Sequence, residues 1–143
     1  MIIESIELQN YRNIEKLKLP LGEKNNILYG DNAQGKTNLL EAIFFGSTGK
    51  SFRFCKDKEL IHFGAEEAHL KMILKKKGIS HRIDIHLKKN KSKGVAIDGF
   101  PVKKSSELFG LGNIIIFSPE DLSLIKNGPK ERRRFIDLEL CQL

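Results

Sequence analysis

The sequence predicts an α/β fold in which a mixed sheet with an antiparallel portion is flanked by helices. Apolar and polar side chains alternate, as in half-buried antiparallel strands, in four segments, residues 2–9, 14–21, 68–76 and 81–89. Residues 25–30 and 113–119 contain short continuous apolar runs, which favour buried strands. Residues 36–47 change to helical spacing. Because no repeat or linker divides the chain, we expect one domain over residues 1–143.

In the first half of the chain, each predicted element ends at a turn or a glycine. The first two strands meet at the "NYRN" corner, and the apolar run that follows ends at Gly30. The helix over 36–47 is expected to use its apolar residues for packing; these are Leu39, Leu40, Ile43 and Phe44. Residues 57–64 predict a short helix closed by Gly64.

The second half begins with two strands around the "KKGIS" turn. Each strand is expected to place its apolar side chains on one face: Leu70, Met72 and Leu74 in the first, and Ile83, Ile85 and Leu87 in the second. Residues 93–100 add a strand that ends in a "DG" turn signal. Ser118 and Asp121 resemble a capping box for a helix whose first position is Pro119, and a final helix is expected from about Pro129.

The composition is that of an ordinary soluble protein, with 40% hydrophobic and 30% charged residues. No apolar stretch approaches the roughly 20 residues that cross a bilayer, and the N-terminal segment lacks the features of a signal peptide. Cys55 and Cys141 show no metal-ligand or disulfide-framework spacing, so we interpret both as plain thiols. A cytoplasmic protein without membrane association is expected.

Positive charge is concentrated in one segment. Between Lys71 and Lys104 there are eleven basic residues and two acidic ones, whereas the remainder of the chain is slightly acidic. Such a distribution is typical of a surface that faces a polyanion. The alternative is a solvated hairpin whose lysines maintain solubility and protect strand edges.

The segment "GDNAQGKT", residues 30–37, matches G-x-x-x-x-G-K-[ST] between a predicted strand and a predicted helix, the context of a phosphate-binding loop. Its glycines let successive N–H groups point inward, and the helix N-terminus adds its positive dipole end. Lys36 suits the β- and γ-phosphates, and the Thr37 hydroxyl suits Mg²⁺. The expected ATP-binding set is Gly30, Asp31, Asn32, Ala33, Gln34, Gly35, Lys36, Thr37 and Asn38. The alternative is a glycine-rich turn that caps a helix and binds nothing.

Five blocks of the sequence resemble, in the same order, the N-terminal lobe of the RecF family: "LQNYRNI", "GDNAQGKTNLLEAI", "STGKSFR", "IDG" and "FSPEDLSLIKNGPKERRRFID". The resemblance extends from about Ile6 to Asp137. It implies an ABC-type, SMC-like ATPase head lobe that binds ATP and Mg²⁺ and belongs to an ATP-dependent homodimer. It also implies a role in DNA replication, recombination, repair and the SOS response. In that role the protein would bind DNA at gaps and single-strand/double-strand junctions, with RecR and RecO, and help to load RecA.

The resemblance assigns roles to residues outside the loop. Arg12 and Asn13 match residues near the nucleotide phosphates, with a simple β-turn as the alternative. Arg53 matches an arginine placed beside the phosphates and the DNA-facing groove, or it is an exposed loop arginine. Pro119 or Glu120 stands where many ABC ATPases present a glutamine to Mg²⁺, so Glu120 is a candidate metal-side carboxylate; alternatively, it is an acid at a helix N-terminus. The arginine run that ends at residue 134 could pair along one helix face or stay solvated.

Two parts of an ABC-type ATPase are missing from the sequence. No apolar strand after Thr37 ends in the Asp-Glu of a Walker B motif, and no Ser-x-Gly-Gln signature is present. We therefore expect an N-terminal lobe of a longer, slow DNA-dependent ATPase. The lobe itself is expected to bind Mg-ATP weakly without hydrolysing it.

Two other functions remain open, a DNA-binding or partner-docking module with a vestigial loop and an ATPase of another ABC or AAA type. The intact Lys36 and Thr37 argue against a vestigial loop, because such a loop has no reason to keep the cation and the metal ligand. The resemblance also adds a polyanionic partner to the basic segment. The lysines expected to face DNA are Lys75, Lys76, Lys77, Lys88, Lys89, Lys91 and Lys93.

Overall fold

The computed structural model describes residues 1–53, 55–117 and 129–140. It confirms the α/β class. In chain order the elements are β1 (Ile2–Tyr11), β2 (Ile14–Pro20), α1 (Lys36–Thr48), the 3-10 helix η1 (Asp57–Leu60), β3 (Glu67–Lys76), β4 (Ile79–Lys88), β5 (Lys91–Ile97), β6 (Phe100–Pro101), the 3-10 helix η2 (Ser105–Gly110) and α3 (Pro129–Leu140). Within these ranges, no helix has the length and apolarity that a membrane crossing needs.

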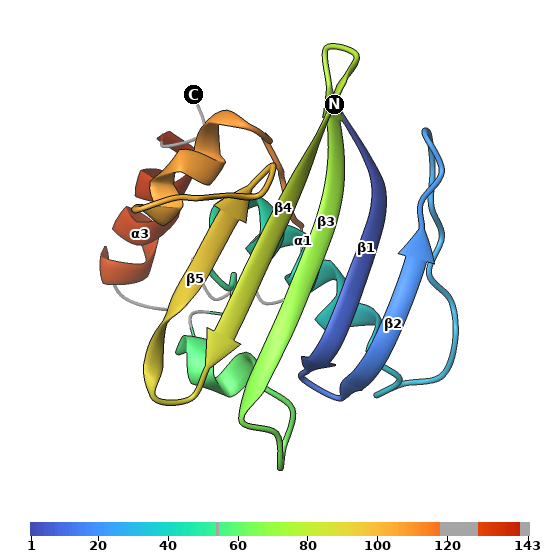
Figure 1. Ribbon diagram of the computed structural model, residues 1–143, viewed down its shortest axis with the longest axis vertical. Helices are drawn as coiled ribbons and strands as arrows, with labels where there is room; N and C mark the ends of the chain where they lie inside the picture. Colours follow the sequence, from blue (N-terminus) through green and yellow to red (C-terminus); the bar gives the residue numbers. More distant parts are fainter. Residues whose placement is uncertain (54, 118–128, 141–143) are drawn as a thin grey trace.

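The six strands form one sheet in the order β2-β1-β3-β4-β5-β6, and all of their pairings are antiparallel. α1 covers one face of this sheet and lies behind it in Figure 1. The helix comes close at Gly46, where a Cβ atom would lie 3.0 Å from the Met72 side chain. The opposite face, here called the outer face, points away from α1.

The predicted alternation in β3 and β4 is confirmed. Leu70 lies opposite Ile85 and Met72 lies opposite Ile83, and all four side chains are buried. Burying one such aliphatic side chain contributes about 1.5 to 3 kcal/mol. The "DG" turn is confirmed as well, because Asp98 and Gly99 both have positive φ, as a tight type I′ hairpin turn requires.

The prediction of buried strands at 25–30 and 113–119 is wrong for the described residues. Residues 25–30 and 112–117 form no strand, and Ile27, Tyr29, Ile115 and Phe117 are between 84% and 95% exposed. A strand buried on both faces needs neighbours on both sides. The strands described pair among themselves, so neither segment receives such a neighbour. Residues 118 and 119 lie outside the described ranges.

The helices agree in place with the predictions but differ in extent. The expected helix at 57–64 is only η1, because Ile61 forms a bridge with Tyr11 and the His62 N–H donates to Asn10 O at 2.8 Å. In α1, Leu40 is 44% exposed and therefore lies outside the predicted packing face. The final helix begins at Pro129 as predicted, whereas the helix predicted to start at Ser118 lies outside the described residues.

Candidate functional site

The glycine-rich loop curls directly into the N-terminus of α1. Gly30 and Gly35 have φ of 142° and 95°, and Ala33 also lies at positive φ. At Gly35 a Cβ atom would lie 3.0 Å from Asn13 Oδ1, closer than ordinary packing allows. Glycine is therefore required there both for its backbone conformation and for the space it leaves. The result is a curled loop that leads into a helix N-terminus, an arrangement, here called the cradle, suited to receive phosphate, although residues 25–30 before it form no strand.

The Lys36 side chain folds back over this loop. Its Nζ donates to the carbonyl oxygens of Gly30 and Asp31 at 2.6 and 2.5 Å. These acceptors are neutral, so a phosphate oxygen, which carries a negative charge, would form a stronger bond with the same ammonium. Beside the lysine is a cavity of about 170 Å³, whose lining includes Thr37 and Arg53.

Asn13 supports the loop from the turn between β1 and β2. Its Nδ2 donates to Ala33 O at 3.0 Å, and its Oδ1 accepts from Asn38 Nδ2 at 2.8 Å. Arg53 Nη1 then donates to Asn38 Oδ1 at 2.9 Å. This series of hydrogen bonds fixes the loop relative to α1 and to the segment after it. Asn13 and Arg53 thus lie beside the loop, and the nearness to nucleotide phosphates that the resemblance implies for them stays a prediction.

Arg12 lies next to the cradle but is held by another group. Its Nε and Nη2 donate to the two carboxylate oxygens of Glu41 at 2.9 and 2.8 Å, and its Nη1 donates to Glu59 O at 2.9 Å. The hydrogen bonds to Glu41 raise the pKa of the Arg12 guanidinium above its already high ordinary value. Arg12 therefore joins the β1–β2 turn to α1, and its side chain does not line the cavity beside Lys36.

Glu41 was missed by the sequence analysis. Its side chain is fully buried in α1, where it also accepts from Ser51 Oγ at 2.5 Å and lies 3.7 Å from Arg53 Nη1. A buried carboxylate is tolerated only when paired and hydrogen-bonded, and here both conditions are met. The available signal was an acid inside the apolar run "LLEAIFF". The buried carboxylate links Arg12, Ser51 and Arg53 beneath the loop.

A second, larger cavity of about 660 Å³ adjoins the loop on the side of β2. Gly35 and Lys36 line both cavities, so the two lie next to each other at the start of α1. The apolar lining of the larger cavity includes Ile14, Leu17, Ile27, Leu28, Tyr29 and Leu39. A ligand with a charged end and a flat apolar end would fit this pair of cavities.

The lysines predicted to face DNA do not form one cluster. Lys75, Lys76 and Lys77 lie at the β3–β4 turn, whereas Lys88, Lys89 and Lys91 lie at the other end of β4. β4 has ten residues and is therefore about 33 Å long, so the two groups of lysines lie about that far apart.

Several of these lysines already have partners. Lys75 lies 3.8 Å from Glu4, Lys76 donates to Gly110 O, Lys88 lies 3.6 Å from Glu67, and Lys89 lies 3.0 Å from Glu66. Apart from Lys76, these are contacts with surface carboxylates, which contribute little and exchange readily.

Lys93 must be removed from the predicted DNA-facing set. Its side chain is only 17% exposed, and its Nζ lies 3.0 Å from Asp57 Oδ2 and 2.5 Å from Gly49 O. The ammonium also stands 5.1 Å from the centre of the Phe45 ring. It therefore joins β5 to the end of α1 and to η1. Glu120, with Ser118 and Pro119, lies outside the described residues, and Arg132 and Arg133 are exposed on α3.

Comparison with known proteins gives a consistent result. The model of the RecF/RecN/SMC N-terminal domain family matches residues 2–123. Over all 143 residues the chain is 62% identical to the DNA replication and repair protein RecF of Lachnoclostridium phytofermentans, and 62% identical to that of Agathobacter rectalis. The chain spans about 40% of the length of these curated relatives.

Solved structures agree with the sequence comparison. A structure described as the recombination mediator protein RecF-ATP in the RecFOR pathway is 39% identical, with a TM-score of 0.89 over 94% of this chain and 38% of that one. The RecF-ATPrS structure gives a TM-score of 0.90 at 38% identity over 98% of this chain and 38% of that one. An SMC ATPase structure with a TM-score of 0.75 is 22% identical, over 96% of this chain and 99% of that one, and shows the fold alone.

Proposed function

The chain belongs to the RecF/RecN/SMC N-terminal domain family, and from this premise we propose that residues 1–143 are the ATP-binding lobe of a RecF-like DNA replication and repair protein. The observation that carries the proposal is the loop at the start of α1, where Lys36, Thr37 and Arg53 line one cavity. The RecF structures that this chain resembles are described with ATP and ATPrS, which supports ATP as the ligand.

The residues present fit a nucleotide with Mg²⁺. The cradle that only glycine permits at position 35 would receive the phosphates, with Lys36 on the β- and γ-phosphates and Arg53 beside them. Thr37 would hold Mg²⁺, which neutralises phosphate charge when bound. The nucleoside would occupy the larger cavity, which shares Gly35 and Lys36 with the cradle.

The names of the relatives support a proposal for the longer protein. We propose that it binds gapped DNA and single-strand/double-strand junctions in the cytoplasm, acts with RecR and RecO to help load RecA, and dimerises over ATP. The Walker B acids and the signature serine are missing from this sequence. The lobe is therefore proposed to bind nucleotide without hydrolysing it, and to leave hydrolysis to the complete ATPase.

Isothermal titration with Mg-ATP tests the nucleotide site. Lys36→Ala removes a charge-assisted contact, so affinity should fall about 10- to 100-fold, which corresponds to about 1.5 to 3 kcal/mol. Thr37→Ala should weaken binding with Mg²⁺ more than binding with EDTA. Lys24→Ala, at an exposed lysine outside the loop, is the matched control. Unchanged affinity in the Lys36 and Thr37 variants would show that ATP binds elsewhere.

The second candidate function is DNA binding by one of the two lysine groups, which lie at opposite ends of β4 and are therefore tested separately. Replacing Lys88, Lys89 and Lys91 with glutamine is compared with the same change at Lys75, Lys76 and Lys77. Substituting the group that faces DNA should flatten the salt dependence of binding, by about 0.9 in log–log slope for each phosphate that is no longer neutralised. If both triple variants keep the wild-type slope, the lysines serve only as a soluble hairpin edge.

A further inference from the structure

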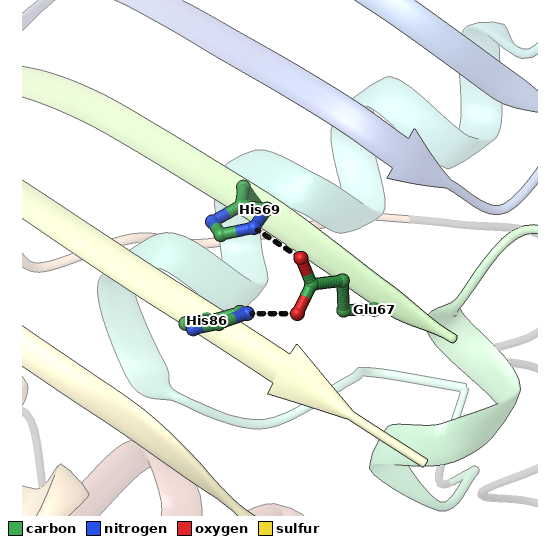
Figure 2. A group of neighbouring side chains, drawn as sticks. All are labelled: Glu67, His69 and His86. Atoms are coloured by element: carbon green, nitrogen blue, oxygen red, sulfur yellow. Dashed lines mark hydrogen bonds and ion pairs between the residues drawn. The ribbon is translucent and has the colours of Figure 1, made fainter. Parts of the chain in front are cut away.

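Two histidines and a glutamate meet on the outer face of the sheet. His69 on β3 and His86 on β4 are directly opposite each other in the register, and Glu67 stands two residues before His69 on the same face. Figure 2 shows the three side chains gathered on the side of the strands away from α1. This cluster is therefore separated by the sheet from the helix whose N-terminus forms the phosphate cradle.

The geometry of the cluster is convergent. The two imidazole rings stack with their centres 4.0 Å apart and their planes 20° from parallel. His86 Nε2 lies 3.0 Å from Glu67 Oε2, and His69 Nε2 lies 3.6 Å from Glu67 Oε1. One ligand atom from each of the three residues lies within 4.8 Å of the other two. The Nε2 atoms of His69 and His86 thus both lie beside the Glu67 carboxylate.

We propose that Glu67, His69 and His86 form a binding site for a divalent transition-metal ion, with Zn²⁺ as the best match. Two imidazole nitrogens and one carboxylate oxygen suit Zn²⁺ and its transition-metal neighbours, whereas Mg²⁺ and Ca²⁺ prefer oxygen ligands alone. Around tetrahedral Zn²⁺ with ligand distances of about 2.1 Å, donor atoms lie roughly 3.4 Å apart. The required approach is small, and all three side chains are partly exposed, so rotation about their side-chain bonds supplies it.

The surroundings leave room for the remaining ligands of the ion. His86 is paired on its other side with Gly94 of β5, and no atom lies within 4 Å of the position where a Cβ would stand at Gly94. Both histidines line a groove of about 560 Å³ on the outer face. Water can therefore complete the coordination. The competing group is Lys88, whose ammonium lies 3.6 Å from Glu67 Oε2 and must move aside.

A bound ion would join two neighbouring strands by side chains as well as by backbone hydrogen bonds. Because the ligands come from β3 and β4, binding would stabilise the folded protein increasingly as the metal concentration rises above its Kd. The site is independent of the proposed nucleotide function, since none of its residues lines the cavities at Lys36.

The test uses the purified 143-residue protein without nucleotide. The protein is treated with EDTA, dialysed and titrated with ZnCl2. We expect one equivalent of Zn²⁺ to bind, the melting temperature to rise with Zn²⁺, and millimolar Mg²⁺ not to compete. His69→Ala and His86→Ala should each lower affinity at least tenfold. His81→Gln is the matched control, because His81 is also on β4 but pairs with Asp98. NMR of the ring protons should show Zn²⁺-dependent shifts at His69 and His86 and none at His62 or His81.

Three results would overturn the proposal. The first is equal Zn²⁺ affinity in the His86→Ala and His81→Gln variants. The second is wild-type NMR spectra in which the rings of His69 and His86 do not respond. The third is binding that disappears only when Cys55 and Cys141 are both replaced by serine, which would place the ion on thiolates.

Discussion

The sheet with α1 and the two segments at residues 25–30 and 112–117 contain the same kinds of apolar side chain in opposite environments. In the sheet, Ile6 and Ile83 are completely buried. In the two segments, Ile27 and Ile115 are 84% and 87% exposed. The comparison shows that an apolar run forms a strand only where a neighbouring strand can pair with it. Each of β1, β3, β4 and β5 has a strand of the described sheet on both sides.

The exposed segments have a consequence for the proposed longer protein. An exposed apolar side chain taken singly is ordinary, but four large ones in two strand-like segments mark a surface that favours further contacts. We expect residues beyond this sequence to pack against these segments. The comparison between the two regions can therefore be tested in both the 143-residue chain and the longer protein.

The largest expected effect comes from making one substitution in both regions. Phe45 is completely buried beneath the sheet, whereas Phe117 is 95% exposed. In the 143-residue chain, Phe45→Ala should lower the free energy of unfolding by about 3 to 5 kcal/mol, and Phe117→Ala should change it by less than about 0.5 kcal/mol. Urea denaturation measures both values.

The same two substitutions can be compared in the longer protein. If additional strands cover residues 112–117, Phe117→Ala should become costly there, while the effect of Phe45→Ala stays the same. A large loss from Phe117→Ala in the 143-residue chain would contradict the comparison, because it would mean that this side chain is already packed.

The second effect tests the buried carboxylate that joins the well-packed region to the phosphate loop. Glu41→Gln keeps the side-chain shape but removes the charge opposite Arg12, so the chain should lose about 2 to 3 kcal/mol of unfolding free energy. Glu15→Gln, at an exposed position, is the control and should change stability by less than about 0.5 kcal/mol. Equal values for the two variants would show that the pair beneath the loop contributes nothing.

Local patterns explain what the sequence could predict. The β3–β4 hairpin was found because each strand carries its own alternation and a glycine turn joins them. The curled loop before α1 was located because its motif needs only eight consecutive residues, and its binding of phosphate stays a prediction. Asn13 and Arg53 were placed beside the loop by resemblance, and the structure brings them there. These features depend little on distant parts of the chain.

Features that depend on distant partners were missed or misjudged. Glu41 sits in an apolar helix face, and only the tertiary structure brings Arg12, 29 residues away, to its carboxylate. The lysine run was interpreted as one surface, but the strand between its two halves carries them to opposite ends of the sheet. Lys93 was assigned to DNA although Asp57, on η1, holds its ammonium. The apolar runs at 25–30 and 113–119 were assigned as strands because periodicity says nothing about whether a neighbour is present.

The third effect compares two glycines, both with positive φ, in the phosphate loop and in a surface turn. Gly64→Ala places its Cβ in open space and should cost about 1 kcal/mol for the backbone conformation alone. Gly35→Ala adds the contact with Asn13 Oδ1, so it should cost about 1 to 3 kcal/mol and should also weaken Mg-ATP binding. Equal losses of stability, with nucleotide affinity unchanged in both variants, would show that the loop tolerates the side chain.

The smallest effect concerns the hairpin turn at the edge of the well-packed sheet. Asp98 accepts from the Arg82 backbone N–H at 2.7 Å and lies 2.8 Å from His81 Nδ1. The hydrogen bond with His81 has the largest effect, followed by the one from the Arg82 backbone, and both hold the pKa of Asp98 below its ordinary value of 3.8. The Asp98 carboxylate therefore takes up a proton less readily in the native state than in the unfolded chain. The charge stabilises the fold above the ordinary pKa, and the contribution is lost as the pH falls through the lowered value.

Asp98→Asn isolates that charge, because asparagine keeps an oxygen for the Arg82 N–H and tolerates the positive φ of 53°. Since the Asp98 side chain is 41% exposed to solvent, the loss at pH 7 should be about 0.5 kcal/mol or less. The difference between wild type and Asp98→Asn should disappear toward pH 2, as measured by urea denaturation across the pH range. Asp98→Ala, which also strains the turn, should cost more and keep part of its cost at low pH. A difference between wild type and Asp98→Asn that stays constant from pH 7 to pH 2 would mean that the turn geometry, and not the carboxylate charge, is what the residue contributes.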